Sequence, residues 1–265
     1  MTIVVRADNL VVSREDRVVM SSSSFDITKG TIVAIIGPNG SGKSTLLDAI
    51  TGLLPATSGD LTVLDTTAEK ARERIAYVLQ HISVTPGVPL TVKEVVTMGR
   101  YASTGLFGAL KAHDRKQVSW AMGQLKIDDL AARHVDKLSG GQRQRVFVAQ
   151  ALAQDHDILL LDEPLTGLDI PSAKVIDDVI HHEPEVGCTV IFTTHDLEEA
   201  RAADQVILVS GRVVASGKPE DVLTPENLAD AYGLGVLHPE HVGQDPVLDP
   251  GHDSVESDTP QGRVS

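Results

Sequence analysis

The chain has 265 residues, enough to bury a sizeable core as one domain or as one domain with an inserted lobe. Its formal net charge of −14 argues against nucleic-acid binding, because neutralising phosphates needs an excess of Lys and Arg. The single cysteine, Cys188, excludes a disulfide framework and favours a cytosolic protein, and we expect it to be a buried thiol at a strand edge.

The first 30 residues are rich in Val and Ile with turn residues between them, and they predict a small antiparallel sheet. They contain neither the charged start nor the long apolar run of a signal peptide. Apolar runs elsewhere, such as IVAII and ILLL, are too short to cross a bilayer. If the protein works at a membrane, we therefore expect another chain to supply the membrane-spanning part.

The next segment, TIVAIIG (31–37), is a β-branched apolar run that predicts a fully buried strand. GPNGSGKST (37–45) follows it, and STLLDAITGL then predicts a helix. Gly37, Gly42, Lys43 and Ser44 fit the pattern G-x-x-x-x-G-K-[ST]. In such a loop, glycines let backbone N–H groups turn around phosphate oxygens, the lysine reaches the β- and γ-phosphates, and the serine ligates Mg²⁺. The sequence therefore predicts a nucleoside-triphosphate site at a strand–loop–helix junction.

Four later segments also predict strands ending in polar residues or Gly, namely RIAYVLQ (74–80), DILLLDEP (157–164), CTVIFTTHD (188–196) and DQVILVSG (204–211). Because helical patterns lie between them, we expect an α/β fold with a mostly parallel sheet. Strand signals vanish between residue 83 and about residue 155, where Thr91 with Glu94 fits a capping box and Asp114 is a second predicted helix cap. We therefore expect a helical lobe inserted at about residues 84–155.

The end of the chain differs in composition from the rest. Residues 236–265 are rich in Pro and acidic residues and contain no aromatic residue, which predicts a disordered acidic tail. His238, His241 and His252 in this tail could hold a metal ion loosely, with a merely solvated tail as the alternative. The folded domain is accordingly expected over residues 1–235.

The segment ILLLDEP places two acidic residues at the end of a buried strand. Asp162 emerges at the carboxyl end, where ligands bind in open α/β sheets, and we expect it to hold Mg²⁺. Glu163 comes next and points differently, so it is well placed to polarise a water molecule for attack on the γ-phosphate. These residues fit a nucleoside-triphosphate hydrolase or a kinase.

The segment LSGGQRQR (138–145) separates these two possibilities. Ser139, Gly140 and Gly141 precede a helical pattern, and a Ser with small residues at a helix start forms a second phosphate-binding end. One γ-phosphate does not need two such ends from one subunit. We therefore expect two copies of the chain to sandwich two ATP molecules head to tail, which favours a hydrolase because a simple kinase would lack this motif.

In these motifs and in their order, the chain resembles the ATP-binding subunits of ABC transporters over about residues 3–235. GPNGSGKST is similar to their Walker A loop, LSGGQRQR to their signature motif and ILLLDEP to their Walker B strand. The resemblance implies that Glu163 is the general base, that His195 in TTHD contacts the γ-phosphate, and that Gln80 in YVLQ links the nucleotide to the membrane partner. It implies an ABC-type ATP hydrolase that uses ATP and Mg²⁺.

The same resemblance assigns further contacts. Asp169 in TGLD matches the D-loop, and Gln80 joins Ser44 and Asp162 as an implied metal ligand. Where the family usually stacks an aromatic residue on adenine, this chain has Arg14, whose guanidinium can also stack on a flat ring. The nucleotide-binding set implied in this way is Arg14, Gly37, Pro38, Asn39, Gly40, Ser41, Gly42, Lys43, Ser44, Thr45, Gln80, Ser139, Gly140, Gly141, Gln142 and Asp169.

The segment TVKEVVTMGRYASTGLFG (91–108) resembles the ATPases of manganese- and zinc-type metal importers, and DEPLTGLD fits that group. This implies a homodimer docked on two membrane-spanning permease chains at the cytoplasmic face of the membrane, with an extracytoplasmic metal-binding protein in the full importer. Ferric-siderophore and cobalamin importers share GRY and LSGGQRQR and remain an alternative. A soluble ABC ATPase is a further alternative, and no nucleic-acid partner is expected.

Overall fold

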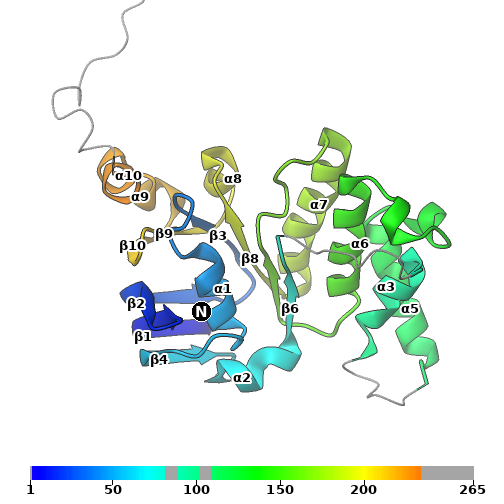
Figure 1. Ribbon diagram of the computed structural model, residues 1–265, viewed down its shortest axis with the longest axis horizontal. Helices are drawn as coiled ribbons and strands as arrows, with labels where there is room; N and C mark the ends of the chain where they lie inside the picture. Colours follow the sequence, from blue (N-terminus) through cyan, green and yellow to red (C-terminus); the bar gives the residue numbers. More distant parts are fainter. Residues whose placement is uncertain (1, 81–88, 102–108, 234–265) are drawn as a thin grey trace, which may run out of the picture.

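The computed structural model describes residues 2–80, 89–101 and 109–233, which form an α/β structure with two sheets (Figure 1). The strands are β1 (Ile3–Arg14), β2 (Arg17–Thr28), β3 (Ile32–Ile36), β4 (Ser58–Val63), β5 (Thr66–Thr67), β6 (Ile75–Val78), β7 (Ile158–Leu161), β8 (Thr189–Thr194), β9 (Gln205–Val209) and β10 (Val213–Gly217). The helices are α1 (Lys43–Ile50), α2 (Ala68–Ala71), α3 (Val92–Met98), α5 (Ala112–Gln124), α6 (Gly140–Leu152), α7 (Ile170–His182), α8 (Leu197–Arg201), α9 (Pro219–Val222) and α10 (Pro225–Tyr232). Short 3₁₀ turns are η1 (Arg72–Arg74), η2 (Asp128–Leu130), η3 (Val135–Lys137) and η4 (Glu183–Val186).

The smaller sheet is antiparallel, in the order β2-β1-β4-β5, and it confirms the sheet predicted for the first 30 residues. Glu15 and Asp16 join β1 to β2 with φ of 45° and 63°, the left-handed conformation of a tight hairpin turn. The sequence analysis missed β4 because Val63 is the one buried residue of that strand, so no apolar alternation marks it.

The larger sheet has the order β10-β9-β3-β8-β7-β6 and contains all five strands predicted from the later apolar segments. It is parallel from β9 to β6, and β10, which was not predicted, adds an antiparallel edge strand. Successive residues of β3 point into two different cores, with Ala34 in one and Ile35 in the other. This burial on both faces is typical of parallel sheets and explains the continuous apolar runs in the sequence.

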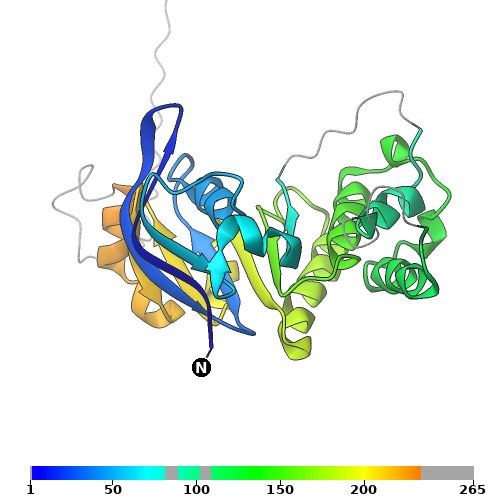
Figure 2. The ribbon, with the colours of Figure 1, turned by 90° about the horizontal axis from the view of Figure 1, so that it is seen from below.

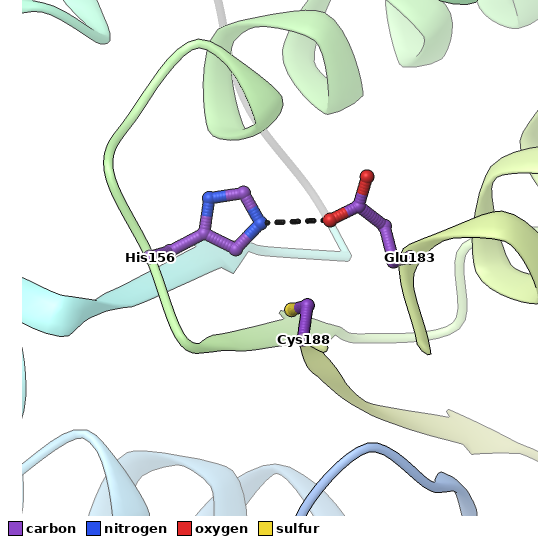
Figure 3. A group of neighbouring side chains, drawn as sticks. All are labelled: His156, Glu183 and Cys188. Carbon is purple, nitrogen blue, oxygen red and sulfur yellow. Dashed lines mark hydrogen bonds and ion pairs between the residues drawn. The ribbon is translucent and has the colours of Figure 1, made fainter. Parts of the chain in front are cut away.

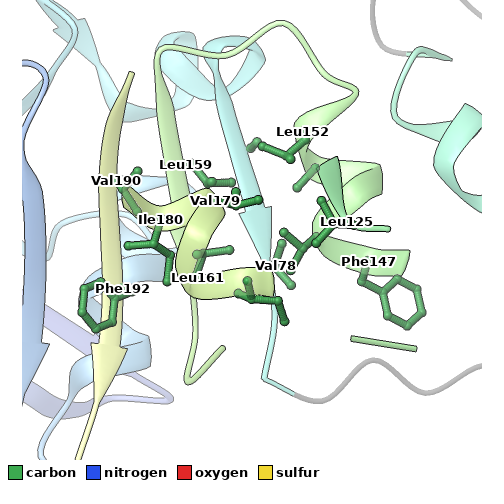
Figure 4. Packing of buried hydrophobic residues seen from close by; sticks show 14 of the residues in the cluster. Val78, Leu125, Phe147, Leu152, Leu159, Leu161, Val179, Ile180, Val190 and Phe192 are labelled. Atoms are coloured by element: carbon green, nitrogen blue, oxygen red, sulfur yellow. The ribbon is translucent and has the colours of Figure 1, made fainter. Parts of the chain in front are cut away.

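Each face of the larger sheet is covered by a different layer. On one face, α1 lies between the two sheets and buries Leu46, Leu47 and Ile50 against them (Figure 1). On the other face, α6 and α7 pack against the sheet, as Figure 4 shows for Leu152 and Ile180 beside residues of β7 and β8. Figure 2 shows the lobe that contains α3 and α5 extending from this side, away from the smaller sheet.

The lobe is helical, as predicted: over residues 89–101 and 109–155 the pairing is limited to one isolated bridge, between Thr91 and His134. Thr91 and Glu94 form the expected capping box, in which the Thr91 N–H donates to Glu94 Oε2 at 2.7 Å. The prediction for Asp114 was wrong in its position. The helix begins at Ala112, and Asp114 reaches back from the first turn to accept the Lys111 N–H at 2.8 Å.

A buried arginine joins three segments of the lobe. Arg100 follows α3 in the chain. Its guanidinium pairs with Asp114, at the start of α5, at 3.0 Å. It also donates to the carbonyl of Ala153, which follows α6, at 2.8 Å. It also forms two hydrogen bonds with Asp155, at 2.8 and 2.9 Å. Hydrogen bonds of this fork geometry fix the relative positions of the three helices.

The predicted acidic tail at 236–265 lies outside the described residues, and so do the boundary expected at residue 235 and the segment 102–108 of the importer-like stretch. Within the part of the chain that is described, every helix is too short or too polar to cross a membrane.

Two Gly→Ala substitutions test the packing of the lobe. A Cβ at Gly99 would lie 2.2 Å from the Gln150 carbonyl oxygen of α6, whereas a Cβ at Gly123 in α5 would meet only Asp128, at 3.8 Å. We expect Gly99→Ala to lower the free energy of unfolding by about 1–3 kcal/mol, because the helices must separate. Gly123→Ala should leave it unchanged or raise it by up to about 1 kcal/mol. Urea denaturation of both variants measures the difference, and equal stabilities would contradict this packing.

Candidate functional site

The loop between β3 and α1 has a shape that only glycine allows at two positions. A Cβ on Gly37 would lie 2.0 Å from the Val209 carbonyl oxygen of β9. Gly42 has φ 106°, a left-handed conformation that places it directly before the first residue of α1. The spacing of the glycines in the motif is therefore required by the path of this backbone.

The start of α1 offers positive charge to a ligand. No side chain caps this helix within the described part of the protein, so its first N–H groups are available to an anion. The Lys43 ammonium is buried here and donates to the Gly37 and Pro38 carbonyls at 2.9 and 3.2 Å. Burial lowers the pKa of Lys43, and the carboxylates of Glu163 and Asp162 partly offset this effect. These donors fit a phosphate chain.

Two acidic residues follow β7 beside this loop, and a threonine of β8 holds both. The Thr193 hydroxyl donates to Asp162 Oδ1 at 2.5 Å and accepts the Glu163 N–H at 2.8 Å. Asp162 is buried, and its carboxylate lies close enough to Lys43 to act on the pKa of that residue. The sequence analysis quoted TTHD but gave Thr193 no role, although its place beside His195 was the available signal.

Glu163 is the centre of the polar cluster. Its backbone has φ 47°, which a residue with a side chain adopts at a cost, and such conformations concentrate at functional sites. The Gln80 amide donates to Glu163 Oε2 at 2.7 Å. His195 Nδ1 lies 3.9 Å from the same oxygen, too far for a hydrogen bond but close enough to act on one ligand.

These groups border one cleft of about 900 Å³. Its lining contains the whole predicted loop together with the polar cluster, namely Gly37, Pro38, Asn39, Gly40, Ser41, Gly42, Lys43, Ser44, Thr45, Gln80, Glu163 and His195. Val19, Thr166 and Tyr232 also line it and were not predicted. Tyr232 ends α10, far along the chain from every motif, so no local pattern could have identified it.

Arg14 does not line this cleft. Its guanidinium forms an ion pair with Asp48 on α1, and its Nε donates to Thr45 Oγ1 at 3.2 Å. Tyr77 also binds Asp48, through its hydroxyl at 3.3 Å, and it packs, partly buried, against the core between the two sheets. Stacking of Arg14 on adenine therefore stays a prediction and would require its side chain to leave Asp48.

The second predicted phosphate-binding end lies elsewhere on the chain. Ser139 caps α6, accepting the Gln142 N–H at 3.2 Å, and Ser139 and Gly140 are exposed. A Cβ on Gly141 would lie 2.5 Å from Ser172 Oγ and 3.0 Å from Asp169 Oδ2, so this helix start packs tightly on the start of α7. Asp169 caps α7, and the Ser172 N–H that it accepts holds the pKa of Asp169 below its usual range. None of these residues lines the cleft of their own chain.

Comparisons with known proteins identify relatives of this chain. The profile of the ABC transporter family matches residues 20–166. The manganese transport system ATP-binding protein MntB of Bacillus subtilis is 39% identical over 230 residues, covering 86% of this chain and 92% of that protein. The zinc transport system ATP-binding protein TroB of Treponema pallidum is 38% identical over 230 residues, covering 86% of each chain.

Two solved structures share the fold. An inward-facing ABC transporter assigned to the metal-chelate type superposes with a TM-score of 0.77 at 30% identity, covering 87% of this chain and 89% of that one. A dimeric ATP-binding cassette in a post-hydrolysis state with ADP and Pi superposes with a TM-score of 0.71 at 29% identity, covering 81% of this chain and 98% of that one.

Substitution of Thr193 by Val tests the link between the two acidic residues. We expect it to lower the free energy of unfolding by about 1–3 kcal/mol, because it leaves the buried Asp162 carboxylate and the Glu163 N–H without their partner. We also expect ATP turnover to fall at least tenfold, since Glu163 loses its support. Thr189→Val, at the other end of β8, removes the acceptor of the Gly30 N–H and is the matched control. It should lose similar stability but keep ATP turnover, and an equal loss of turnover in both variants would refute the role given to Thr193.

Proposed function

Because this chain belongs to the ABC transporter family, we propose that it is the ATP-hydrolysing subunit of a membrane importer for manganese or zinc ions. The observation that carries the proposal is the meeting of Gln80, Glu163 and His195 around the phosphate-binding loop in one cleft. These three residues come from the ends of separate strands, β6, β7 and β8. Convergence of polar groups on a cradle for phosphate is what hydrolysis of ATP requires.

Each side chain has a distinct part in hydrolysis. ATP binds with its phosphates around Lys43 and the first turn of α1, replacing the carbonyl contacts of the ammonium. Glu163 is the general base that takes a proton from the attacking water. Gln80 holds one oxygen of that carboxylate at 2.7 Å and leaves the other for the water. His195, whose side chain is 57% exposed, reaches the γ-phosphate from the mouth of the cleft.

Mg²⁺ fits the oxygen donors that lie beside the phosphates. Ser44 and Gln80 line the cleft, and the buried Asp162 carboxylate lies close enough to Lys43 to act on its pKa. Oxygen ligands of this kind, completed by water and phosphate, are those that Mg²⁺ prefers. A Mg²⁺ ion held by these residues would neutralise charge on the β- and γ-phosphates.

The functional unit in this proposal is a homodimer. Ser139, Gly140, Gly141 and Gln142 of one copy face the nucleotide of the other, which agrees with the exposure of Ser139 and Gly140 and with the position of all four away from their own cleft. The dimeric cassette with ADP and Pi supports such an assembly. Two membrane-spanning permease chains complete the transporter, so the chain acts as a peripheral subunit at the cytoplasmic face of the membrane.

The metal cargo is supported by the relatives that transport manganese and zinc. An extracytoplasmic metal-binding protein would deliver the ion to the permease chains. The structural likeness to a metal-chelate type transporter supports an alternative, in which the cargo is a chelate such as a ferric siderophore or cobalamin.

The role of Glu163 is tested by its isosteric amide. We expect Glu163→Gln to bind ATP and to dimerise, but to hydrolyse ATP about 10²–10⁴ times more slowly, because an amide cannot accept the proton. Glu220→Gln, on the exposed start of α9, is the matched control and should turn over at the normal rate. Single-turnover hydrolysis with purified protein measures the difference. Near-normal hydrolysis by Glu163→Gln would show that Glu163 is not the general base.

The cargo is tested by uptake in cells that lack this chain and in the same cells with it restored. We expect labelled manganese or zinc uptake to fall in the deletion, to return with the wild-type chain, and to stay low with Glu163→Gln. Parallel uptake of a labelled ferric siderophore and of cobalamin tests the alternative. Selective loss of either chelate would replace the metal-ion proposal, and unchanged uptake of all cargoes with intact ATPase activity would refute both.

A further inference from the structure

Three side chains with metal-binding atoms meet at the end of the central sheet opposite the nucleotide cleft: His156, Glu183 and Cys188. His156 precedes β7, Glu183 follows α7 and Cys188 precedes β8. Because β7 and β8 are neighbouring parallel strands, the segments that enter them lie side by side. Figure 3 shows the imidazole and the carboxylate facing each other, with the thiol beside them.

The three groups are buried at distances close to those of a metal centre. The side chains of His156 and Glu183 are 5% and 4% exposed, and His156 Nε2 lies 3.2 Å from Glu183 Oε2. The two atoms and the Cys188 sulfur all lie within 4.8 Å of one another. Bonds of about 2.0–2.3 Å to a tetrahedral Zn²⁺ place ligand atoms about 3.3–3.7 Å apart. A shift of the thiol by about 1 Å would reach that geometry.

The imidazole is already oriented for coordination. His156 Nδ1 lies 2.9 Å from the Gln154 carbonyl oxygen, which can only accept, so Nδ1 carries a hydrogen and Nε2 faces Glu183. A backbone carbonyl that holds the other ring nitrogen in this way is usual for metal-ligating histidines. Burial disfavours a charged imidazole, yet the hydrogen bonds with Cys188 and Glu183 raise the pKa of His156 to about 10. Because Nδ1 already carries a hydrogen, the hydrogen bond of 3.2 Å between Nε2 and Glu183 Oε2 needs one further proton between these two atoms.

The other two ligands are held by their backbone. The Cys188 N–H donates to the Glu183 carbonyl at 3.1 Å, which closes the turn that follows α7. Gly187 completes this turn with φ 93°, a conformation suited to glycine, and its N–H donates to the Pro184 carbonyl at 3.0 Å. The separation of the Glu183 and Cys188 backbones is therefore fixed by a short, hydrogen-bonded turn, and the thiol can move by rotation of its side chain.

We propose that His156, Glu183 and Cys188 bind a divalent cation of the Zn²⁺ class. Imidazole nitrogen, thiolate sulfur and carboxylate oxygen are the donors that Zn²⁺ takes, whereas Mn²⁺ favours oxygen donors. Binding releases the thiol proton and the proton between His156 and Glu183 to solvent, and the metal ion bonds to the three freed atoms. The site lies apart from the nucleotide cleft, and the inference does not rest on the proposed cargo.

A groove borders the site at His156. His156 lines a groove of about 620 Å³, which has Gly99 and Trp120 of the lobe on one side and Glu73 and Arg74 of the core on the other. Water in this groove can supply the fourth ligand that three protein ligands leave open. An open position makes reversible binding the expected behaviour, in contrast to the closed sites of four protein ligands that hold structural zinc.

Cobalt spectroscopy on the full-length protein tests the proposal directly. Reduced, chelator-treated protein is titrated with Co²⁺, which takes the same tetrahedral ligands as Zn²⁺ and gives a charge-transfer band in the near ultraviolet when bound to a thiolate. Cys188 is the only cysteine of the 265 residues, so this band reports the site alone, and His238, His241 and His252 cannot produce it. We expect a band that saturates at one Co²⁺ per chain and that Zn²⁺ removes.

Ligand variants complete the test. Cys188→Ser should abolish the band, and His156→Gln and Glu183→Gln should each weaken Co²⁺ binding at least tenfold. His181→Gln and Glu185→Gln, two exposed neighbours, are matched controls that should leave binding unchanged. Absence of the band in the wild-type protein, which needs no variant to fold, would overturn the proposal and leave a buried ion pair. If folded His156→Gln and Glu183→Gln both bound Co²⁺ with the affinity of the wild-type protein, the proposal would also be overturned.

Discussion

Each parallel strand of the central sheet packs against an apolar core on both faces. Charged side chains are therefore placed beyond the ends of the strands. β3 contributes Ala34 to one core and Ile35 to the other, and β7 divides Leu160 and Leu161 in the same way. Because the strands from β9 to β6 run in one direction, their carboxyl ends form one edge. The phosphate loop and the acidic residues meet at that edge for this reason alone.

The chemistry at this edge depends on a strained residue. A left-handed conformation at Glu163 costs on the order of 1–3 kcal/mol, and in this conformation the carboxylate accepts a hydrogen bond from the Gln80 amide. The cost is offset by the Thr193 hydroxyl, which bonds both to the Glu163 N–H and to Asp162. One hydroxyl on β8 thus separates the two acidic residues of β7 into a buried ligand and an accessible base.

The sequence predicts the parts of the fold that have a local cause. Apolar runs and glycine spacing give the five parallel strands and the phosphate loop, and Thr91 with Glu94 gives a helix start. Features that depend on contacts between distant segments cannot be predicted from local sequence patterns. β4 exposes most of its residues, the Arg14 guanidinium pairs with Asp48, and Tyr232 reaches the cleft from α10. The His156, Glu183 and Cys188 cluster is a further case, because only the pairing of β7 with β8 brings it together.

One helix joins the region where a second copy would bind to the far side of the lobe. α6 has 13 residues and begins at the exposed cap Ser139, so it extends over about 20 Å. Its first turn packs tightly on α7 through Gly141, and just past its last turn the Ala153 carbonyl accepts from the buried Arg100, which also binds Asp114. In the proposed dimer, a displacement of Ser139 by the other copy's nucleotide would therefore move α6 as a rigid helix, and with it the helices of the lobe. His156 lies between the end of α6 and the start of β7, so the proposed metal site lies where α6 connects to the central sheet. An ion bound there would link the end of α6 to the start of β8.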